Sequence, residues 1–288
     1  MLTKASKCPT NIMQDVANFV CKRENFLKEN LPLCGTLTEV IKALAASDLW
    51  FVLADGQPTA VFKLETHGRT AMVSQICMNS GDSLETVISG LRGELREMRI
   101  NELTLRVAPN EVEQCSASGF ERGPAYVRFS RVPTESNMMP ILPLTNITQK
   151  ELPILSELMY TAYAKTDCGF SDIQSAEALL RTIMSGGRGQ YLSNASFASG
   201  TRPNLVSACL LTVDSPGEAK IEQLFTHPLY RARGFATTEI AAAMNRLATS
   251  SVNSLTAWNR EGNDVVRRLL IKMGFRQDPT VIEMTGGI

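Results

Sequence analysis

Apolar and polar residues follow a similar order in two halves of the chain. Residues 49–65, "LWFVLADGQPTAVFKLE", alternate on either side of Asp55-Gly56, a pattern that predicts two strands joined by a tight turn. Residues 191–213 repeat this pattern with Gly200 to Asn204 in the turn. The chain therefore contains two predicted hairpins, one in each half.

A helical pattern follows each hairpin, at residues 83–99 and 236–249. Each half then ends with a β-rich run, a polar break, a short segment that closes in Gly-Phe, and a last strand. The order is helices, a β-meander, then strand–helix–strand–helix–strand. It predicts an α+β (mixed α/β) fold duplicated in tandem, with a mostly antiparallel central sheet and flanking helices in each half. Two unrelated α/β units would give the same layout.

The least structured stretch is "RVPTESNMMP", residues 131–140, where two prolines flank polar residues. We place the boundary there and expect one domain over residues 1–131 and a second over residues 139–288.

Composition is that of an ordinary globular protein. Of the 288 residues 44% are hydrophobic, and 29 Lys and Arg balance 29 Asp and Glu, so no bulk charge favours nucleic acid or an anionic membrane. The seven cysteines form no C-x-x-C pair and there are two histidines, which argues against a metal site. No membrane-length apolar run or signal-peptide core occurs, so we expect a cytoplasmic protein.

The loop between a predicted strand, Ile221 to Thr226, and the helix from Ala236 carries the most specific signal. It contains Arg231, Arg233 and Gly234. Amides at a helix start lack intrahelical partners, and a glycine lets several of them point at one anion, so the loop predicts a pyrophosphate site. An ordinary strand–helix turn is the alternative on spacing alone.

The wider window resembles the central motif of the GNAT superfamily of N-acetyltransferases. In that motif a strand leads through Pro-x-Tyr into (Gln/Arg)-x-x-Gly-x-(Gly/Ala), and Arg231, Gly234 and Ala236 fill it. A second GNAT motif, an Asn that begins a helix closing in Gly-Phe, matches Asn263 and Gly274-Phe275. The resemblance covers roughly residues 140–285.

The resemblance implies acetyl-CoA as acyl donor and no metal. The loop would bind the pyrophosphate, and amides near Phe225 and Thr226, on a strand that splays from its neighbour, would polarise the thioester carbonyl. An amine of a small molecule or peptide would attack directly in a ternary complex. The residues expected to contact the cofactor are Leu224, Phe225, Thr226, Arg231, Ala232, Arg233, Gly234, Phe235, Ala236, Thr237 and Asn263.

Glu222 is the candidate general base, because several GNAT enzymes place a glutamate at this strand position. Alternation puts it on the same face as Leu224 and Thr226. The alternative is that Glu222 pairs with a lysine or arginine at the sheet surface. His227 is a weaker candidate base, in a turn before proline.

The general acid is open. Leu270 stands where many family members have a tyrosine that protonates the CoA thiolate, so Tyr230, Tyr160 or Tyr163 would have to serve, or the thiolate would leave unassisted. Tyr230 could also be a spacer that packs against the loop. A CoA-binding protein without turnover is therefore a second hypothesis, and an interaction module a third.

The first half lacks the loop, since its strand runs into Ser80-Gly81-Asp82-Ser83, an ordinary N-cap. We expect residues 1–131 to be a degenerate GNAT-like domain that completes the substrate cleft, an arrangement similar to glycine N-acyltransferases. Acceptor recognition would come from helices at 151–163 and 173–184 and their connection, with Asp167, Cys168 and Phe170. The glycine cluster at 184–192 follows a helix and predicts a helix end.

Overall fold

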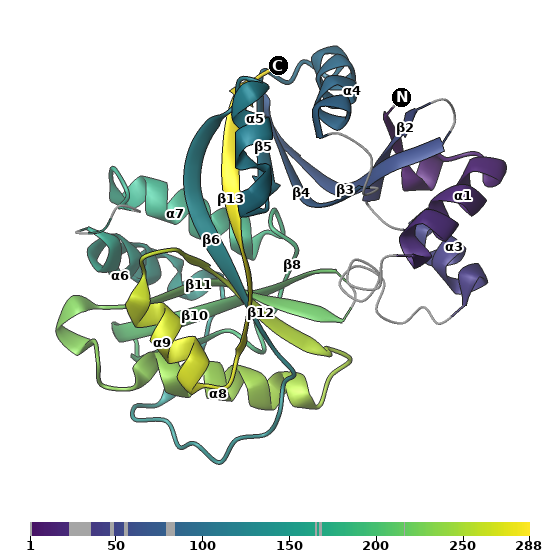
Figure 1. Ribbon diagram of the computed structural model, residues 1–288. Helices are drawn as coiled ribbons and strands as arrows, with labels where there is room; N and C mark the ends of the chain where they lie inside the picture. Colours follow the sequence, from purple (N-terminus) through teal and green to yellow (C-terminus); the bar gives the residue numbers. More distant parts are fainter. Residues whose placement is uncertain are drawn as a thin grey trace. The chain divides into compact units, whose positions relative to one another are not determined.

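The computed structural model describes residues 2–22, 36–46, 49–54, 57–78, 84–164, 166, 169–215 and 217–288. The chain forms two compact units (Figure 1). Unit 1 comprises Met1–Tyr126 and Pro279–Ile288, and unit 2 comprises Val127–Asp278.

Unit 1 is built on a sheet in which an antiparallel meander leads into one parallel pair. Strands β1 to β4 pair antiparallel in chain order, β4 and β5 run parallel, and β13 pairs antiparallel with β5. The strands that contribute to this unit are β1 (Leu2–Lys4), β2 (Leu49–Ala54), β3 (Gln57–His67), β4 (Thr70–Met78), β5 (Glu102–Val107), β6 (Glu121–Arg131) and β13 (Arg276–Gly287).

Helices cover both faces of this sheet, and successive residues of β2 point into two different cores. Phe51 packs with α1 (Thr10–Cys21) and α3 (Leu37–Ala46), whereas Val52 packs with α4 (Leu84–Glu97) on the other face. The short elements η1 (Ala5–Lys7), η2 (Pro109–Glu111) and α5 (Val112–Ala117) complete the described part of the unit.

Unit 2 repeats the plan. Strands β7, β9, β10 and β11 pair antiparallel in that order, and β11 runs parallel to β12. The strands are β7 (Leu144–Asn146), β8 (Gln190–Tyr191), β9 (Phe197–Thr201), β10 (Asn204–Ser215), β11 (Glu218–Thr226) and β12 (Ser254–Arg260). The hairpin predicted here forms, with Arg202-Pro203 between β9 and β10.

The helices of unit 2 lie on opposite faces of its sheet (Figure 1). On one face α6 (Leu152–Tyr163) and α7 (Ile173–Met184) pack over Leu210 and Phe225. On the other α8 (Phe235–Ala248) and α9 (Asp264–Lys272) pack over Leu211 and Ile221. The turns η3 (Gln149–Glu151) and η4 (Pro228–Tyr230) precede α6 and α8.

The two units therefore share one order of elements: a meander, a parallel strand pair joined by a helix, a second helix and a last strand. This agrees with the predicted α+β fold. The units differ in extent from the predicted domains, since they meet after Tyr126 and residues 279–288 belong to unit 1. The reason is that β13 pairs with β5 from Ile282 opposite Val107 to Gly287 opposite Glu102.

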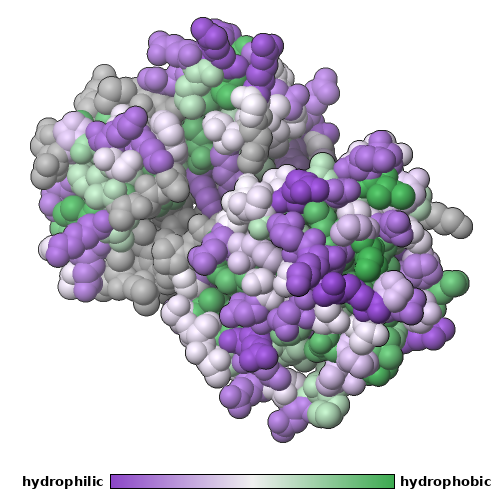
Figure 2. All heavy atoms as spheres, turned by 180° about the vertical axis from the view of Figure 1, so that it is seen from behind, coloured by the Kyte–Doolittle hydropathy of each residue, from purple (hydrophilic) through white to green (hydrophobic). Residues whose placement is uncertain are grey.

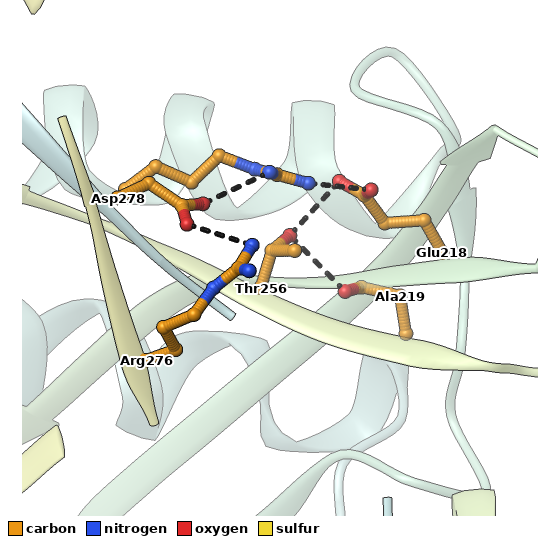
Figure 3. Close-up of polar contacts among 6 residues, drawn as sticks. Glu218, Ala219, Thr256, Arg276 and Asp278 are labelled. Carbon is orange, nitrogen blue, oxygen red and sulfur yellow. Dashed lines mark hydrogen bonds and ion pairs between the residues drawn. The ribbon is translucent and has the colours of Figure 1, made fainter. Parts of the chain in front are cut away.

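A network of charges fixes the start of the parallel pair in unit 2 (Figure 3). The buried Arg128 guanidinium donates to Asp278 Oδ2 at 3.1 Å and to Glu218 Oε2 at 2.7 Å. Thr256, on β12, donates to Glu218 Oε1 at 3.1 Å, and Arg276 lies 3.0 Å from Asp278 Oδ1. Two carboxylates and two guanidiniums balance, as burial of charge requires.

The segment between the predicted domains lies along α8. Asn245 clamps Ser136: its Oδ1 accepts from the Ser136 amide at 2.6 Å, and its Nδ2 donates to the Ser136 carbonyl at 2.9 Å. Met138, Met139 and Ile141, in the same segment, are exposed. On the face drawn in Figure 2, hydrophobic residues (green) form small patches among hydrophilic ones (purple).

Several predictions fall outside the described residues: the Asp55-Gly56 turn, the break at Ser80-Gly81-Asp82-Ser83, and Asp167 and Cys168. The glycine cluster after α7 does end that helix. Gly186 has φ +90° and its amide donates to the Ile183 carbonyl.

Candidate active site

A β-bulge in β11 changes which way the predicted site residues point. Leu210 pairs with Gln223 and Leu211 pairs with Ile221, so Glu222 has no partner on β10. Ile221 and Leu224, three residues apart, consequently pack in the same core, under α8. The extra residue turns Glu222 to the α6–α7 face, where Thr212 contacts it. The predicted shared face of Glu222 with Leu224 and Thr226 is therefore wrong, because the bulge interrupts the alternation.

Beyond the bulge, β11 separates from its parallel neighbour. The ladder between β11 and β12 runs from Glu218–Ser254 to Ile221–Ala257 and stops, although β11 continues to Thr226 and β12 to Arg260. A splay between these strands was expected from the resemblance, and the end of the ladder is consistent with it.

The antiparallel ladder with β10 fixes where the amides of this segment point. The His227 amide donates to the Val206 carbonyl at 2.8 Å, which continues the register that pairs Phe225 with Ala208. Hydrogen-bonded pairs alternate along such a ladder. The Phe225 amide therefore faces β10, while the amides of Leu224 and Thr226 face the side on which β12 has ended its pairing. Of the two amides predicted to polarise a carbonyl, Thr226 fits and Phe225 does not.

The loop that follows has the backbone of an anion-binding turn. Ala232 has φ +59° and Gly234 has φ +88° with ψ 2°, two left-handed residues separated by Arg233. Alternation of this kind turns successive amides to one side of the chain. An L-residue at the Gly234 conformation would be strained, which accounts for glycine there.

The N-terminus of α8 lacks a side-chain cap. Its first helical hydrogen bond is from the Thr238 amide to the Gly234 carbonyl at 3.1 Å, so the amides of Phe235, Ala236 and Thr237 precede it. By contrast, Asp172 and Asn263 cap α7 and α9 through their side chains. The start of α8 is thus open to an external hydrogen-bond acceptor.

Arg231 is engaged within the protein. Its Nε donates to the Thr226 carbonyl at 3.3 Å, and its Nη2 donates to the carbonyl of Ala162 on α6. The Arg233 guanidinium lies 5.4 Å from the centre of the Tyr230 ring. Arg231 therefore ties the end of β11 to α6, and Arg233 is the more available of these two cations.

Tyr230 packs within the loop, as the spacer alternative supposed. Its ring makes edge contacts with His227 at 5.6 Å and Phe235 at 6.2 Å between centroids. His227 Nδ1 accepts from the Leu229 amide at 3.2 Å and so caps η4. Tyr163, a candidate acid, donates to Gln223 Oε1 at 3.2 Å.

The second motif forms the start of α9. Asn263 Oδ1 accepts from the Val266 amide at 3.4 Å, and buried Asn259 donates to the Asn263 carbonyl at 3.1 Å. Because β11 and β12 are parallel, Asn263 and the Arg231–Ala236 loop follow strands that end on the same side of the sheet. Leu270 is fully buried in the core under α8 and α9.

Glu222 is held by cations. Its side chain is 1% exposed; Oε1 lies 2.7 Å from Lys220 Nζ, and Oε2 lies 3.7 Å from Arg188 Nη1. Thr212 donates to Oε1 at 3.1 Å. These contacts match the alternative that Glu222 pairs with a lysine or an arginine.

The buried carboxyl of Glu239, on α8, was not predicted from the sequence. Glu239 is 0% exposed, and its Oε1 accepts from the amide and hydroxyl of Ser199 at 3.0 and 2.7 Å. Ser207 Oγ lies 3.0 Å from Oε2 and 2.8 Å from Thr226 Oγ1. Burial raises the pKa of Glu239 to about 8, against the hydrogen bonds from Ser199 and Ser207. The available signal was a charged residue between apolar positions of a helix.

The described residues contain no cluster of three or more His, Cys, Asp or Glu that could hold a metal ion. Within the same residues, no helix is long and apolar enough to cross a membrane. Among the described cysteines, Cys8, Cys21, Cys115 and Cys209 are free thiols.

Comparison with known proteins gives a structural match. The fold resembles a GCN5-related N-acetyltransferase from Sphaerobacter thermophilus, with TM-score 0.66 and 12% identity over 100% of this chain and 95% of that one. It also resembles a tandem GNAT protein from the clavulanic acid biosynthesis pathway, with TM-score 0.61 and 15% identity over 100% and 97%. The chain has a tandem GNAT fold. An acetyltransferase of the GNAT family from Colwellia psychrerythraea matches with TM-score 0.52 and 9% identity over 95% and 97%.

At such low sequence identity, the resemblance to these structures shows the fold alone and nothing about activity. No family model matches the sequence, and no curated protein matches it.

Proposed function

We propose that unit 2 binds acetyl-CoA and transfers its acetyl group to an amine of a small molecule or peptide. The observation that carries this proposal is the continuous segment from β11 to α8. It combines a strand end that has parted from β12, two left-handed loop residues, and a helix start without a side-chain cap.

The pyrophosphate would lie against the amides that precede the first helical bond of α8. Phe235, Ala236 and Thr237 supply these amides, and Arg233 supplies nearby charge. Asn263, at the neighbouring strand end, belongs to the same side of the sheet. Leu224 and Thr226 supply amides directed away from β10, toward the place that the acyl-pantetheine arm would occupy.

Transfer would then be direct. The Thr226 amide donates to the thioester carbonyl as negative charge develops on it, a contribution that is typically about 3 kcal/mol for one such donor. The rest of the rate comes from holding the amine in line with the carbonyl carbon. The amine loses its proton to solvent in this scheme, because Glu222 is held in ion pairs.

A second function, CoA binding without turnover, is favoured by one observation. Leu270 fills the core at the position where a tyrosine would protonate the thiolate, so no acid reaches the site from α9 at that residue. Unit 1 would then be a degenerate GNAT-like domain, whose sequence lacks the Arg-x-x-Gly-x-Ala motif.

Thermal melting with and without acetyl-CoA tests cofactor binding. At 100 times the dissociation constant the native state gains about 2.7 kcal/mol, a shift of several degrees. Gly234→Trp should abolish the shift, because it places a side chain on a residue with φ +88° at the anion site. Gly68→Trp is the matched control, at φ +61° with no atom within 4 Å of the added Cβ.

A shift that survives in Gly234→Trp would show that the loop is not the cofactor site. Release of CoA thiol with a panel of primary amines then separates the two functions: turnover supports the transferase, and binding without turnover supports the second proposal.

A further inference from the structure

A line of hydrogen-bonding side chains connects the buried carboxyl of α8 to the end of β11. It passes from Glu239 Oε2 to Ser207 Oγ at 3.0 Å and on to Thr226 Oγ1 at 2.8 Å. Glu239 and Ser207 are both 0% exposed, whereas Thr226 is partly exposed. The line therefore runs from the core to an accessible hydroxyl.

The accessible end, Thr226, lies at the end of β11, where the acyl group of acetyl-CoA is proposed to bind. Thr226 lies past the last β11–β12 pair, and its backbone faces away from β10. Arg231 already holds the Thr226 carbonyl from that side. A hydroxyl at this residue is well placed to donate to the cofactor.

Each hydroxyl has one proton, so the protonation of Glu239 decides which group donates to which along this line. A serine or threonine hydroxyl donates one hydrogen bond. When Glu239 is ionised, Ser207 donates to the carboxylate, and Thr226 donates to Ser207. When Glu239 is neutral, its carboxyl proton lies on Oε2 and is donated to Ser207, which donates onward to Thr226 or to the Phe225 carbonyl 3.1 Å away. When Ser207 donates to Thr226, the Thr226 proton is free to donate outward; when Ser207 donates to the Phe225 carbonyl, Thr226 can still donate to Ser207.

We propose that Glu239, Ser207 and Thr226 form a relay in which neutral Glu239 directs the Thr226 hydroxyl to donate to the acyl-thioester end of bound acetyl-CoA. This inference rests on the proposed function of unit 2. Glu239 is a positioning residue, since it acts through Ser207. The same hydroxyl, as a hydrogen-bond donor, stabilises the thiolate when it departs, where Leu270 offers no donor.

The surroundings of Glu239 keep the carboxyl neutral at pH 7. Burial raises its pKa to about 8, and the Ser199 bonds to Oε1 leave Oε2 to face Ser207. Cys209, on β10, is the titratable neighbour; burial and then the Glu239 charge raise the pKa of its thiol, so it stays protonated. The thiol adds no charge that would draw the proton from Glu239.

The test is the affinity for acetyl-CoA, measured by titration calorimetry between about pH 7 and about pH 9.5, above the usual range of phosphate and histidine titration. Wild-type affinity should fall with rising pH, as Glu239 ionises and Thr226 turns inward. The expected loss is roughly threefold to tenfold, the worth of one hydrogen bond.

Three variants isolate the relay from other groups that titrate in this window. Glu239→Gln donates permanently to Ser207 through its amide, so it should bind as the wild type does near pH 7 and show no fall. Thr226→Val should bind roughly threefold to tenfold more weakly than the wild type near pH 7, with an affinity that does not change with pH and equals that of the wild type at the high-pH end. Ser207→Ala should lose the pH dependence while retaining Glu239.

The results separate failure of the relay from failure of the proposed function. Absence of acetyl-CoA binding by the folded wild type would reject the proposed function and the relay with it. Binding whose affinity does not change with pH, or a fall of equal size in Glu239→Gln, would reject the relay and leave the proposed function intact.

Discussion

The carboxylate of Glu222 lies 2.7 Å from the ammonium nitrogen of Lys220, two residues earlier on β11. Strand alternation places both side chains on one face, where Thr212 and Arg188 complete the set, and the bulge separates this face from that of Leu224. Glu222 therefore forms ion pairs with Lys220 and Arg188.

Replacement of Glu222 by glutamine tests this interpretation. The unfolding free energy should fall by about 1–3 kcal/mol, the usual worth of hydrogen bonds to a charged group. Turnover with any amine accepted by the wild type should change by less than about tenfold, since a general base contributes typically 10²–10⁴-fold. Urea denaturation and thiol-release kinetics measure the two quantities.

Lys220→Met is the matched control for this change. It removes the partner cation while keeping the carboxylate, so it should lower stability without the rate loss that removal of a base causes. A drop of 100-fold or more in Glu222→Gln alone, at unchanged stability, would restore the base assignment at about that magnitude.

Arg128 offers a stability test at the start of the same strand. Arg128→Met removes one guanidinium from a network in which Glu218 and Asp278 remain (Figure 3). Breaking a buried ion pair by removing one partner should cost about 3–5 kcal/mol. The sequence has two tryptophans, Trp50 and Trp258, so a Trp50→Phe background makes Trp258 fluorescence on β12 report unfolding of unit 2.

The triple change Arg128→Met, Glu218→Gln, Asp278→Asn is the companion measurement. It removes the stranded carboxylates as well, so it should recover part of the loss. A single variant as stable as the wild type would mean that the network contributes nothing to unit 2.

Periodic features of this fold could be predicted from the sequence. The helix expected at 236–249 is α8 at Phe235–Ala248, and that expected at 173–184 is α7. Both have long amphipathic patterns, and Gly234 and Gly186 mark boundaries through their left-handed backbone. The repeated order of elements was readable for the same reason.

Two features of the site and one of the fold were not readable from the sequence. The bulge at Glu222 adds one residue to a strand without a compositional signal, yet it reverses the face of that side chain. Arg231 looked like a phosphate ligand, but its bonds to Thr226 and Ala162 depend on tertiary contacts. The register that pairs β13 with β5 likewise joins residues far apart in sequence. Such pairings follow from packing, which a local pattern does not encode.

Asn245 should control the opening of the segment before β7. Its side-chain amide makes both hydrogen bonds to the Ser136 backbone, and Met138 and Met139 beside it are exposed. Asn245→Ala should raise the rate of proteolytic cleavage within residues 132–143, because local opening becomes easier by about 1–3 kcal/mol when these bonds are lost. Mass spectrometry of the fragments identifies the site.

Ser250→Ala, just past the C-terminus of α8, is a control of similar size. It removes the hydroxyl that donates to the Leu247 carbonyl. It should leave cleavage of the segment unchanged. Equal cleavage of Asn245→Ala and wild type would show that the clamp does not limit opening.

Glu239 gives the stability of unit 2 a distinctive pH dependence. Its pKa in the folded protein is raised by burial from the usual 4.5 of a glutamate to about 8, so the folded state binds more protons between these values. The unfolding free energy must therefore fall as pH rises through this window, by roughly 3–5 kcal/mol in total at 1.36 kcal/mol per unit. The contribution is complete below the unfolded pKa and lost once pH exceeds the folded one.

Glu239→Gln removes this titration and keeps the size of the side chain. In the Trp50→Phe background, urea unfolding followed at Trp258 should show wild type and variant close in stability near pH 5, with the variant gaining steadily up to about pH 9, a range chosen to bracket the shift. Other titrating groups contribute equally to both proteins and cancel in the difference. A difference that stays constant with pH would mean that Glu239 ionises in the folded protein as it does in the unfolded chain, and its bonds to Ser199 and Ser207 would then be those of a buried carboxylate at neutral pH.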